Sequence, residues 1–322
     1  MTSAVATPLI YSHTVGHYAM AGRGFSNPVD LTFTSDGAIY VISRGNPAQA
    51  VVALRVSVVT MDEQDLGQFG GYGTKDGQFR WPTAIAADVQ DRIYIADEHR
   101  NDIQVFAKDG TFLSKWGVAG QAPGQLNRPS GLAFDPQGNL VVVDHLNHRV
   151  QTFTPDGDLV ACWGRYGRGP GQFDLPWGVT VAPDGAIFVA DWNNHRIQKL
   201  APDGTPLATF GSLGTGPGEL QRPSGVAVDA QGWVYVADRG NDRVVVFTGD
   251  GVPIADLRGD SELSPWAVQF LEGNPDLVEI RKDADLTPEK RFWGPTAVAI
   301  APGGEVCVLE TLRHRIQVYR RT

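Results

Sequence analysis

The sequence predicts an all-β fold, namely a six-bladed β-propeller that is closed by its own N-terminal strand. One segment recurs six times along the 322 residues, and each copy divides into short runs of alternating residues bounded by Gly, Pro and Asp. The composition agrees, because 38 Gly and 21 Pro indicate a folded chain rich in turns. A helical period is absent from the repeated segment.

Each copy opens at a proline and closes at an Asp-Gly turn. The opening prolines are spaced by 54, 47, 47, 47 and 72 residues, and they are Pro28, Pro82, Pro129, Pro176, Pro223 and Pro295. Spacings in this range are typical of propeller blades and exceed those of leucine-rich and ankyrin repeats. In the copy at Pro176 we expect four strands, over 178–182, 187–191, 196–200 and 207–211, with a Pro-Asp-Gly turn between the first two.

The two ends of the chain complete the ring. The final copy runs from Pro295 to the last residue in 28 residues, which is short of a blade, and 27 residues precede Pro28. We therefore expect the segment around Tyr11 to Tyr18 to supply the outer strand of the last blade, which removes the open edges. Residues 1–322 then form a single domain.

The repeated motifs resemble the NHL repeat. They are Val189-Ala190-Asp191 followed by Arg196-Ile197-Gln198, and the Gly-Pro-Gly-Gln-Phe of residues 169–173, with close copies in the neighbouring units. The resemblance covers essentially the whole chain and implies a six-bladed propeller of bacterial type. Proteins of this family bind proteins or RNA or act as bacterial sensor domains, and they include the peptidyl-hydroxyglycine amidating lyase, so the fold alone implies no single activity.

The similarity to the amidating lyase is distant, because the zinc histidines of that enzyme are missing. In that family they occupy places beside the opening prolines, where this chain has other residues: Thr83, Ser130, Trp177, Ser224 and Thr296. We predict no cofactor. A divalent metal in the central channel stays open, with Asp30, Asn27 and Glu98 as candidate oxygen ligands.

Residues that recur in most blades are expected to be structural. An acid ends the second strand of five copies and an Arg follows five residues later in four of them, as in Asp144 and Arg149. A pair present in most blades meets a need that every blade has, namely a partner for a partly buried carboxylate. The same reasoning applies to His148, His195 and His314.

Function is expected where the repeats differ, at the channel mouth. The loops before the first strand and after the second strand of each blade share one face of a propeller. The predicted ligand-binding residues on these loops are Arg128, Arg222, Arg239, Arg44, Trp81, Trp177, Trp192, Trp293 and Asn27. Arg suits a carboxylate or phosphate and Trp offers a flat apolar wall, so we expect a small anionic or aromatic ligand.

The same loops hold the candidate catalytic groups His145, His99 and Glu98. A lyase or hydrolase would use Arg128 or Arg222 to anchor a small acidic or aromatic substrate, and one of the two histidines as its base. No nucleophile elbow, P-loop or dinucleotide fingerprint accompanies them. The alternatives are therefore a ligand-binding propeller, an enzyme acting at the same mouth, and a protein-interaction scaffold.

The connection between the fifth and sixth copies carries 25 extra residues, within 259–294. Ser264-Pro265 and Thr287-Pro288 are helix start signals, so a small helical insertion is expected. Because it leaves from a mouth-side loop, it is expected to form a lid over the channel or, as the alternative, a surface brace or a dimer contact.

Charge and composition limit the partners. The net charge of −9 disfavours nucleic acid, and the longest apolar run is far short of the ~20 residues that span a membrane. Residues 1–20 lack the basic and apolar regions of a secretory signal, so a cytoplasmic location is expected. Cys162 and Cys307 lie on opposite blades and are not expected to form a disulfide.

Overall fold

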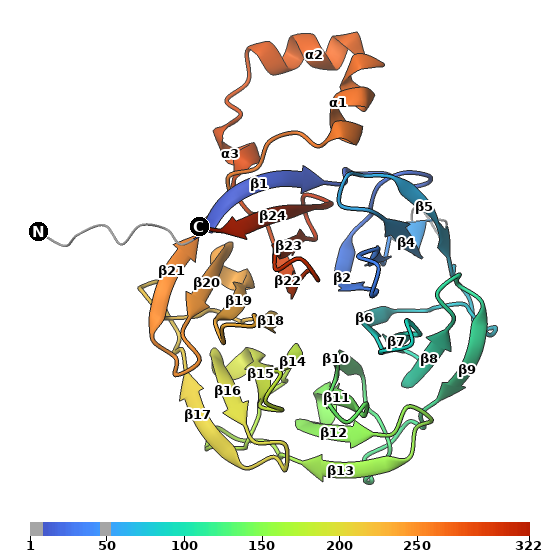
Figure 1. Cartoon of the computed structure of the whole chain (residues 1–322), viewed down its shortest axis with the longest axis vertical. Helices are drawn as coiled ribbons and strands as arrows, with labels where there is room; N and C mark the ends of the chain where they lie inside the picture. Colours follow the sequence, from blue (N-terminus) through green and yellow to red (C-terminus); the bar gives the residue numbers. More distant parts are fainter. Residues whose placement is uncertain (1–8, 46–52) are drawn as a thin grey trace, which may run out of the picture.

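The chain folds as a ring of six four-stranded antiparallel sheets around a central axis (Figure 1). The computed structural model describes residues 9–45 and 53–322. In each sheet the strands follow the chain from the inner to the outer edge of the ring, apart from the last blade. The predicted six-bladed propeller is confirmed.

The strands of the first three blades are β2 (Pro28–Phe33), β3 (Ile39–Ser43), β4 (Arg55–Val59) and β5 (Asp65–Phe69), then β6 (Pro82–Ala87), β7 (Ile93–Asp97), β8 (Asp102–Phe106) and β9 (Phe112–Trp116), then β10 (Pro129–Phe134), β11 (Leu140–Asp144), β12 (Arg149–Phe153) and β13 (Leu159–Trp163). The fourth and fifth blades comprise β14 (Val179–Val181), β15 (Ile187–Asp191), β16 (Arg196–Leu200) and β17 (Pro206–Phe210), then β18 (Gly225–Val228), β19 (Val234–Asp238), β20 (Arg243–Phe247) and β21 (Pro253–Leu257).

The sixth blade joins both ends of the chain. Its inner strands are β22 (Pro295–Ile300), β23 (Val306–Glu310) and β24 (Arg315–Arg321), and its outer strand is β1 (Leu9–Val15). β1 pairs antiparallel with β24, so that Tyr11 faces Tyr319 and Val15 faces Ile316. The predicted closure by the N-terminal strand is therefore confirmed, with the strand at 9–15.

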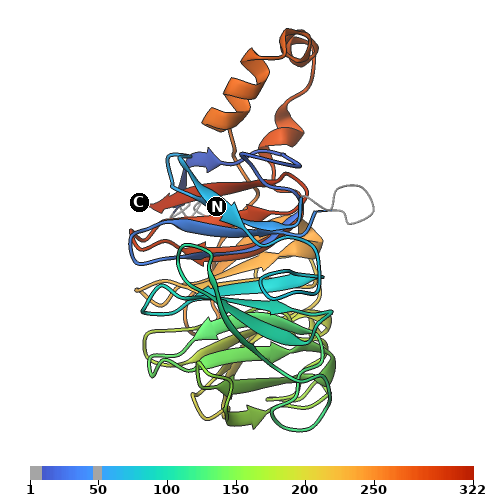
Figure 2. The ribbon, with the colours of Figure 1, turned by 90° about the vertical axis from the view of Figure 1, so that its right-hand side faces the viewer.

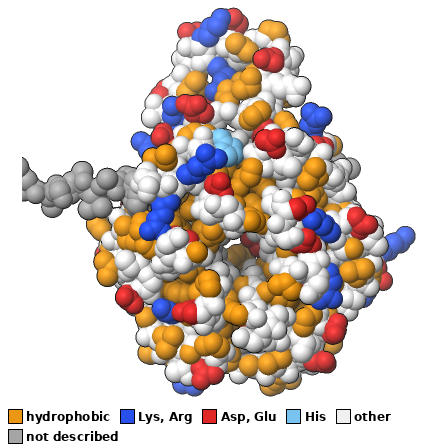
Figure 3. Space-filling view, in the orientation of Figure 1, with side chains coloured by type: hydrophobic (Ala, Val, Ile, Leu, Met, Phe, Trp, Pro, Cys, Tyr) orange, Lys and Arg blue, Asp and Glu red, His pale blue; other side chains and the backbone are white. Residues whose placement is uncertain are grey.

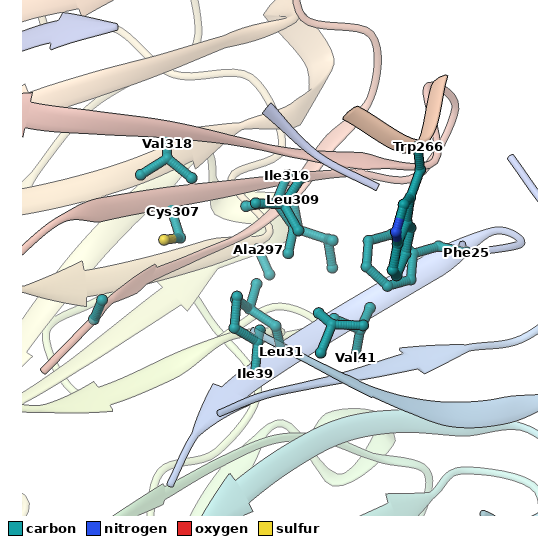
Figure 4. Packing of buried hydrophobic residues seen from close by; sticks show 13 residues of the cluster. Phe25, Leu31, Ile39, Val41, Trp266, Ala297, Cys307, Leu309, Ile316 and Val318 are labelled. Atoms are coloured by element: carbon teal, nitrogen blue, oxygen red, sulfur yellow. The ribbon is translucent and has the colours of Figure 1, made fainter. Parts of the chain in front are cut away.

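The hydrophobic core lies between neighbouring blades. The cluster between the fourth and fifth blades contains Phe188, Phe210, Val236 and Phe247. Between the sixth and first blades, Leu31 and Ile39 share a cluster with residues of β23 and β24 and with Trp266 of the insertion (Figure 4). The ring is therefore held by apolar contacts between adjacent sheets as well as by hydrogen bonds within them.

The recurring acid and Arg form the expected ion pairs. The Arg Nε to carboxylate distance is 2.7 Å in each of four pairs: Arg149–Asp144, Arg196–Asp191, Arg243–Asp238 and Arg315–Glu310. The second blade differs, because Asp102 takes the place of the Arg and pairs with Arg100 at 2.9 Å. The first blade has Ser43 at the acid position, opposite Arg55.

The recurring histidines also have a structural task. His148, His195 and His314 adopt positive φ angles of 52°, 56° and 55°. Each Nδ1 accepts a hydrogen bond from the backbone N–H of the residue that precedes the opening proline of the next blade, at 3.0–3.1 Å. Asn101 accepts the same bond through its side-chain oxygen. This position therefore joins consecutive blades.

The insertion forms three short helices, α1 (Pro265–Glu272), α2 (Pro275–Lys282) and α3 (Thr287–Lys290). Ser264 caps α1, as its start signal predicts, by accepting a hydrogen bond from Ala267 N–H at 3.2 Å. The helices project outward beyond β1 and β24, away from the channel (Figures 1 and 2).

The expected lid over the channel is therefore wrong, and the insertion stands at the outer edge of the ring. Trp266 is buried beside Phe25 (Figure 4), in a cluster that also contains Val15, and its backbone N–H donates a 2.6 Å hydrogen bond to the buried Glu63 carboxylate. Apolar burial at the outer edge of the sixth and first blades thus directs the helices sideways. Within residues 9–45 and 53–322, no helix is long and apolar enough to cross a membrane.

Candidate functional site

The predicted mouth residues lie at one end of the ring. Pro129 pairs with Asp144, and Pro295 pairs with Glu310, so the start of each inner strand lies beside the end of the second strand. The loops that precede the first and follow the second therefore meet on one face. A hollow is visible at the centre of the ring (Figure 3), and it leads into a channel lined by the inner strands of all six blades.

Hydroxyl and other side chains tie the inner strands together just inside the mouth. Each of these side chains donates a hydrogen bond of 2.7–3.4 Å to the carbonyl oxygen of the opening proline in the next blade. The pairs are Thr83 and Pro129, Ser130 and Pro176, Ser224 and Pro295, Thr311 and Pro28, and Arg44 and Pro82. Thr83, Ser130 and Ser224 therefore join neighbouring blades.

Three of the predicted tryptophans are covered by arginines. The guanidinium carbon lies 5.1 Å from the ring centroid for Arg44 over Trp81, 4.7 Å for Arg222 over Trp192, and 5.1 Å for Arg313 over Trp293. Such cation–π contacts contribute roughly 0.5–1 kcal/mol at exposed sites. The first two pairs join one blade to the next, so these residues build the rim as well as facing solvent. Arg313 was missed by the sequence analysis, although it belongs to the loop that follows β23.

His145 packs against the fourth predicted tryptophan. Its ring lies edge-on to Trp177 at 5.1 Å between centroids, and its Nδ1 is 3.0 Å from the carbonyl oxygen of Pro176. The carbonyl requires a proton on Nδ1, which leaves Nε2 as the free acceptor of a neutral ring. Burial lowers the pKa of His145, so the neutral form is favoured.

Four predicted residues line one pocket at the rim. Trp81, Glu98, His99 and Arg128 surround a volume of about 250 Å³. Burial raises the pKa of Glu98, and the nearby positive charges of Arg44 and Arg128 oppose that shift. The structure thus brings both catalytic candidates Glu98 and His99 to an anchoring Arg. The third candidate, His145, lies apart from them against Trp177.

Asn27 and Arg222 take part in the joints between blades. Both have positive φ angles, 47° and 52°, and donate their backbone N–H to His314 and His195. The amide nitrogen of Asn27 also donates to the carbonyl oxygen of Gly45 at 3.2 Å. Asn27 therefore has a structural role in the rim.

Arg44 and Arg239 are cations without a carboxylate partner. The Nη2 of Arg44 is buried and has no hydrogen-bond partner, while its Nε donates to Pro82 O at 2.7 Å. Burial, with a smaller contribution from the positive charge of Arg239, lowers the pKa of Arg44 to about 10, against the opposing charge of Glu98. Burial also lowers the pKa of Arg239, although this residue keeps exposed surface at the rim.

Neither Arg44 nor Arg239 forms an ion pair within the part of the chain that the structure describes, and residues 1–8 and 46–52 contain no Asp or Glu. Glu98 acts on Arg44 only through space. The chain therefore supplies no direct counter-ion to either guanidinium.

The acidic residues that make the net charge negative gather at the opposite end of the ring. They occupy turns between the first and second strands and between the third and fourth strands of the blades: Asp36, Asp62, Asp91, Asp109, Asp156, Asp184, Asp203 and Asp250. These eight negative charges therefore lie away from the mouth, and the net charge of −9 does not by itself describe the charge there.

Asp30 is the acidic side chain of the channel wall. The channel encloses about 340 Å³, and Asp30 accepts hydrogen bonds from the N–H groups of Leu31 and Ile85, both at 2.9 Å. Burial raises its pKa to about 7. Among residues 9–45 and 53–322, no group of three or more His, Cys, Asp or Glu side chains could hold a metal ion.

Comparisons with known proteins agree with this fold. The NHL repeat family matches residues 79–106, 126–153, 173–200, 220–247 and 292–319, which belong to five of the six blades. Protein brain tumor from Drosophila melanogaster is 40% identical over 45 residues, which are 14% of this chain and 4% of that protein. The chain thus aligns with only a small part of that relative.

Solved structures include two similar lyases. A streptogramin B lyase is 13% identical over the whole of both chains, with a TM-score of 0.59. A catalytically inactive virginiamycin B lyase from Staphylococcus aureus, solved with quinupristin, is 13% identical over 94% of this chain and 82% of that chain, with a TM-score of 0.57. A protein of unknown function from Bacteroides thetaiotaomicron is 18% identical over 98% and 76% of the two chains, with a TM-score of 0.61.

At these identities the solved structures show the fold alone. The family match adds the repeat, and each matched segment runs from just before an opening proline to the third strand of its blade. The chain is therefore a six-bladed β-propeller with NHL repeats in five of its blades.

Proposed function

We propose that this propeller binds a small anionic or aromatic ligand at the channel mouth, with Arg44 and Arg239 as the partners of its anionic group. The observation that carries the proposal is a pair of guanidiniums, close enough for one charge to act on the other, that have no carboxylate partner among the described residues; the Nη2 of Arg44 is also buried and makes no hydrogen bond there. A desolvated cation without a partner is costly to the folded protein, and a bound anion removes that cost.

The surroundings suit a ligand of this class. The Trp81 ring packs against the Arg44 guanidinium and also lines the pocket with Glu98, His99 and Arg128. A planar acid could therefore place its anionic group between the arginines and its ring against the indole. The outward position of α1 to α3 leaves the mouth open to such a molecule.

A thermal-shift series tests the proposal. The wild-type protein is heated with small carboxylates, phosphates and aromatic acids, and binding to the folded state raises the melting temperature. Arg239→Gln removes a side chain that makes no hydrogen bond within the described chain, so its fold should be kept. The matched control is Arg320→Gln, since exposed Arg320 forms only a long 3.8 Å ion pair with Glu305.

The proposal expects a shift with at least one acid in the wild type and in Arg320→Gln, and a much smaller shift in Arg239→Gln. Equal shifts in all three proteins would place the ligand elsewhere. The absence of any shift in the wild type would remove the support for an anion site.

A lyase or hydrolase acting at the same mouth is the second candidate. It is favoured by Glu98, whose pKa burial raises, in a pocket with His99 and Arg128. A carboxyl group with a raised pKa holds its proton to higher pH than a free carboxyl group and can act as a general acid. Turnover of a bound acid, lost in Glu98→Gln while binding persists, would support catalysis.

A protein partner is the third candidate, and the outward direction of the insertion favours it because the mouth face stays uncovered. Tyr166 is 67% exposed and packs on His148 at 5.0 Å between centroids, and Tyr18 is 55% exposed and packs on His314 at 4.7 Å. Exposed aromatic side chains at repeated positions are typical of recognition surfaces. Loss of a captured protein in Tyr166→Ser, with small-acid binding unchanged, would support this role.

A further inference from the structure

Asp30 distinguishes the first blade from the other five. It stands two places after the opening proline, where the other blades have only small residues: Ala84, Gly131, Gly178, Gly225 and Ala297. Asp30 and four of these five residues line the central channel, and the second blade lines it through the neighbours of Ala84, namely Thr83 and Ile85. One blade thus adds a carboxyl group to a wall that is otherwise made of apolar side chains, hydroxyls and backbone.

No cation of the chain balances this carboxyl group. Its two oxygens accept backbone N–H groups from Leu31 and from Ile85 of the next blade. Asp30 forms no ion pair within residues 9–45 and 53–322, and residues 1–8 and 46–52 contain no Lys, Arg or His. Each oxygen keeps a further lone pair that could accept a hydrogen bond from a molecule in the channel.

Arg44 and Asp30 reach the same neighbouring strand at two depths. Arg44 Nε donates to the carbonyl oxygen of Pro82, and Asp30 Oδ2 accepts from the N–H of Ile85. Pro82 and Ile85 are three residues apart on β6, which corresponds to about 10 Å at the rise of a β-strand. The strand positions that Arg44 and Asp30 contact are thus about 10 Å apart along one wall, with the unpaired positive group nearer the mouth and the unpaired negative group deeper in the channel.

We infer that the ligand is a small amino-carboxylate, bound with its carboxylate at Arg44 and Arg239 and its ammonium group at Asp30. The inference rests on the proposed function and extends it from an anion to a molecule of both charges. A simple acid would leave Asp30 unbalanced, and a simple amine would leave the two arginines unbalanced. The single carboxylate of Asp30 also suits one ammonium group better than a divalent metal ion, because a divalent ion beside it would leave an uncompensated positive charge in the channel.

Length is part of the inference. A separation of about 10 Å is matched by an extended chain of about three amino-acid residues or by an ω-amino acid of similar reach. The cavity of about 340 Å³ can hold a slender molecule of this kind. Ligands with adjacent amino and carboxyl groups are too short to reach both sites.

Isothermal titration with three matched probes tests this. The probes are octanoate, octylamine and ω-aminooctanoate, which share one hydrocarbon chain and differ in their charged ends. The wild type should bind ω-aminooctanoate about tenfold more tightly than octanoate, as expected for one added charge-assisted hydrogen bond. In Asp30→Asn this advantage should disappear while the affinity for octanoate is unchanged.

A second variant guards against a folding defect. Asp30→Ala gives the first blade the residue that the second and sixth blades carry at this position. It should lose the preference for ω-aminooctanoate in the same way. A wild type that binds octanoate and ω-aminooctanoate equally, or a preference that survives in both variants, would overturn the inference and leave the proposed anion site standing. If none of the probes binds, both fail.

Discussion

Arg149 donates its Nε hydrogen to Oδ2 of Asp144 at 2.7 Å, where β11 ends and β12 begins, and both side chains are buried. The same guanidinium donates to the carbonyl oxygens of Gln121, Ala122 and Gln125 in the preceding loop. One ion pair therefore attaches the loop that enters the blade to the hairpin inside it. Its recurrence explains why the blades keep this acid and this Arg.

Asp144→Asn should strongly destabilise the protein. The substitution leaves the Arg149 charge buried without its partner, and breaking a buried pair in this way costs about 3–5 kcal/mol. The midpoint of urea unfolding is the measurement, with Asp203→Asn as the control because Asp203 lies in an exposed turn. A loss no greater than that of the control would mean that the pair contributes little.

Ser43→Asp should stabilise the first blade. Ser43 lies opposite the buried Arg55, as Asp144 lies opposite Arg149, and Arg55 has no carboxylate partner among the described residues. The new carboxylate should also accept the N–H of Ser26, which Ser43 Oγ accepts now at 3.1 Å. We expect a gain of about 1 kcal/mol in the free energy of unfolding. A loss in urea unfolding would show that desolvating the new charge outweighs the pair.

Acid should weaken the joint at His314. Burial lowers the pKa of this ring to about 4 in the folded protein, whereas the unfolded value is 6.5. The unfolded chain therefore binds more protons between these values, and the stability that is complete above pH 6.5 is lost as the pH falls toward 4. His314→Asn should reduce this loss, since Asn101 accepts the same backbone bond in the second blade. Equal melting profiles between pH 4 and 7 would contradict the assignment.

The contribution of Asp30 to the stability of the folded protein should depend on pH in the opposite direction. Burial raises its pKa to about 7 from 3.8, so the folded protein binds the extra proton and its stability falls as the pH rises between these values. The melting temperature of Asp30→Ala minus that of the wild type should therefore increase from pH 4 to pH 7. A difference that is constant with pH would show that Asp30 is ionised throughout.

The features predicted well from the sequence are those that every blade needs. The four strands of each blade and the ion pair of Asp144 with Arg149 could be predicted because they recur along the chain, and the closing strand near Tyr11 because the last copy is one strand short. The rim residues Trp81, Glu98, His99 and Arg128 could be placed together because the register of a propeller decides which loops share a face.

The features that were missed depend on contacts that occur once. The direction of the insertion is decided by Trp266, which packs against Phe25 at the outer edge, and no repeat signals that contact. Arg313 covers Trp293 from the same blade, whereas the other two Arg–Trp pairs join different blades. The net charge of −9 also gives no information on where the charged residues lie, so it does not show that eight aspartates are at the end of the ring opposite the mouth.

The most direct test of the anion site uses the acid that gives the largest thermal shift. Its affinity is measured by isothermal titration calorimetry in the wild type, Arg239→Gln and Arg320→Gln. The account predicts that Arg239→Gln weakens binding by about tenfold or more, because a charge-assisted contact is lost, while Arg320→Gln binds as the wild type does. The same affinity in all three proteins would contradict a ligand site between Arg44 and Arg239.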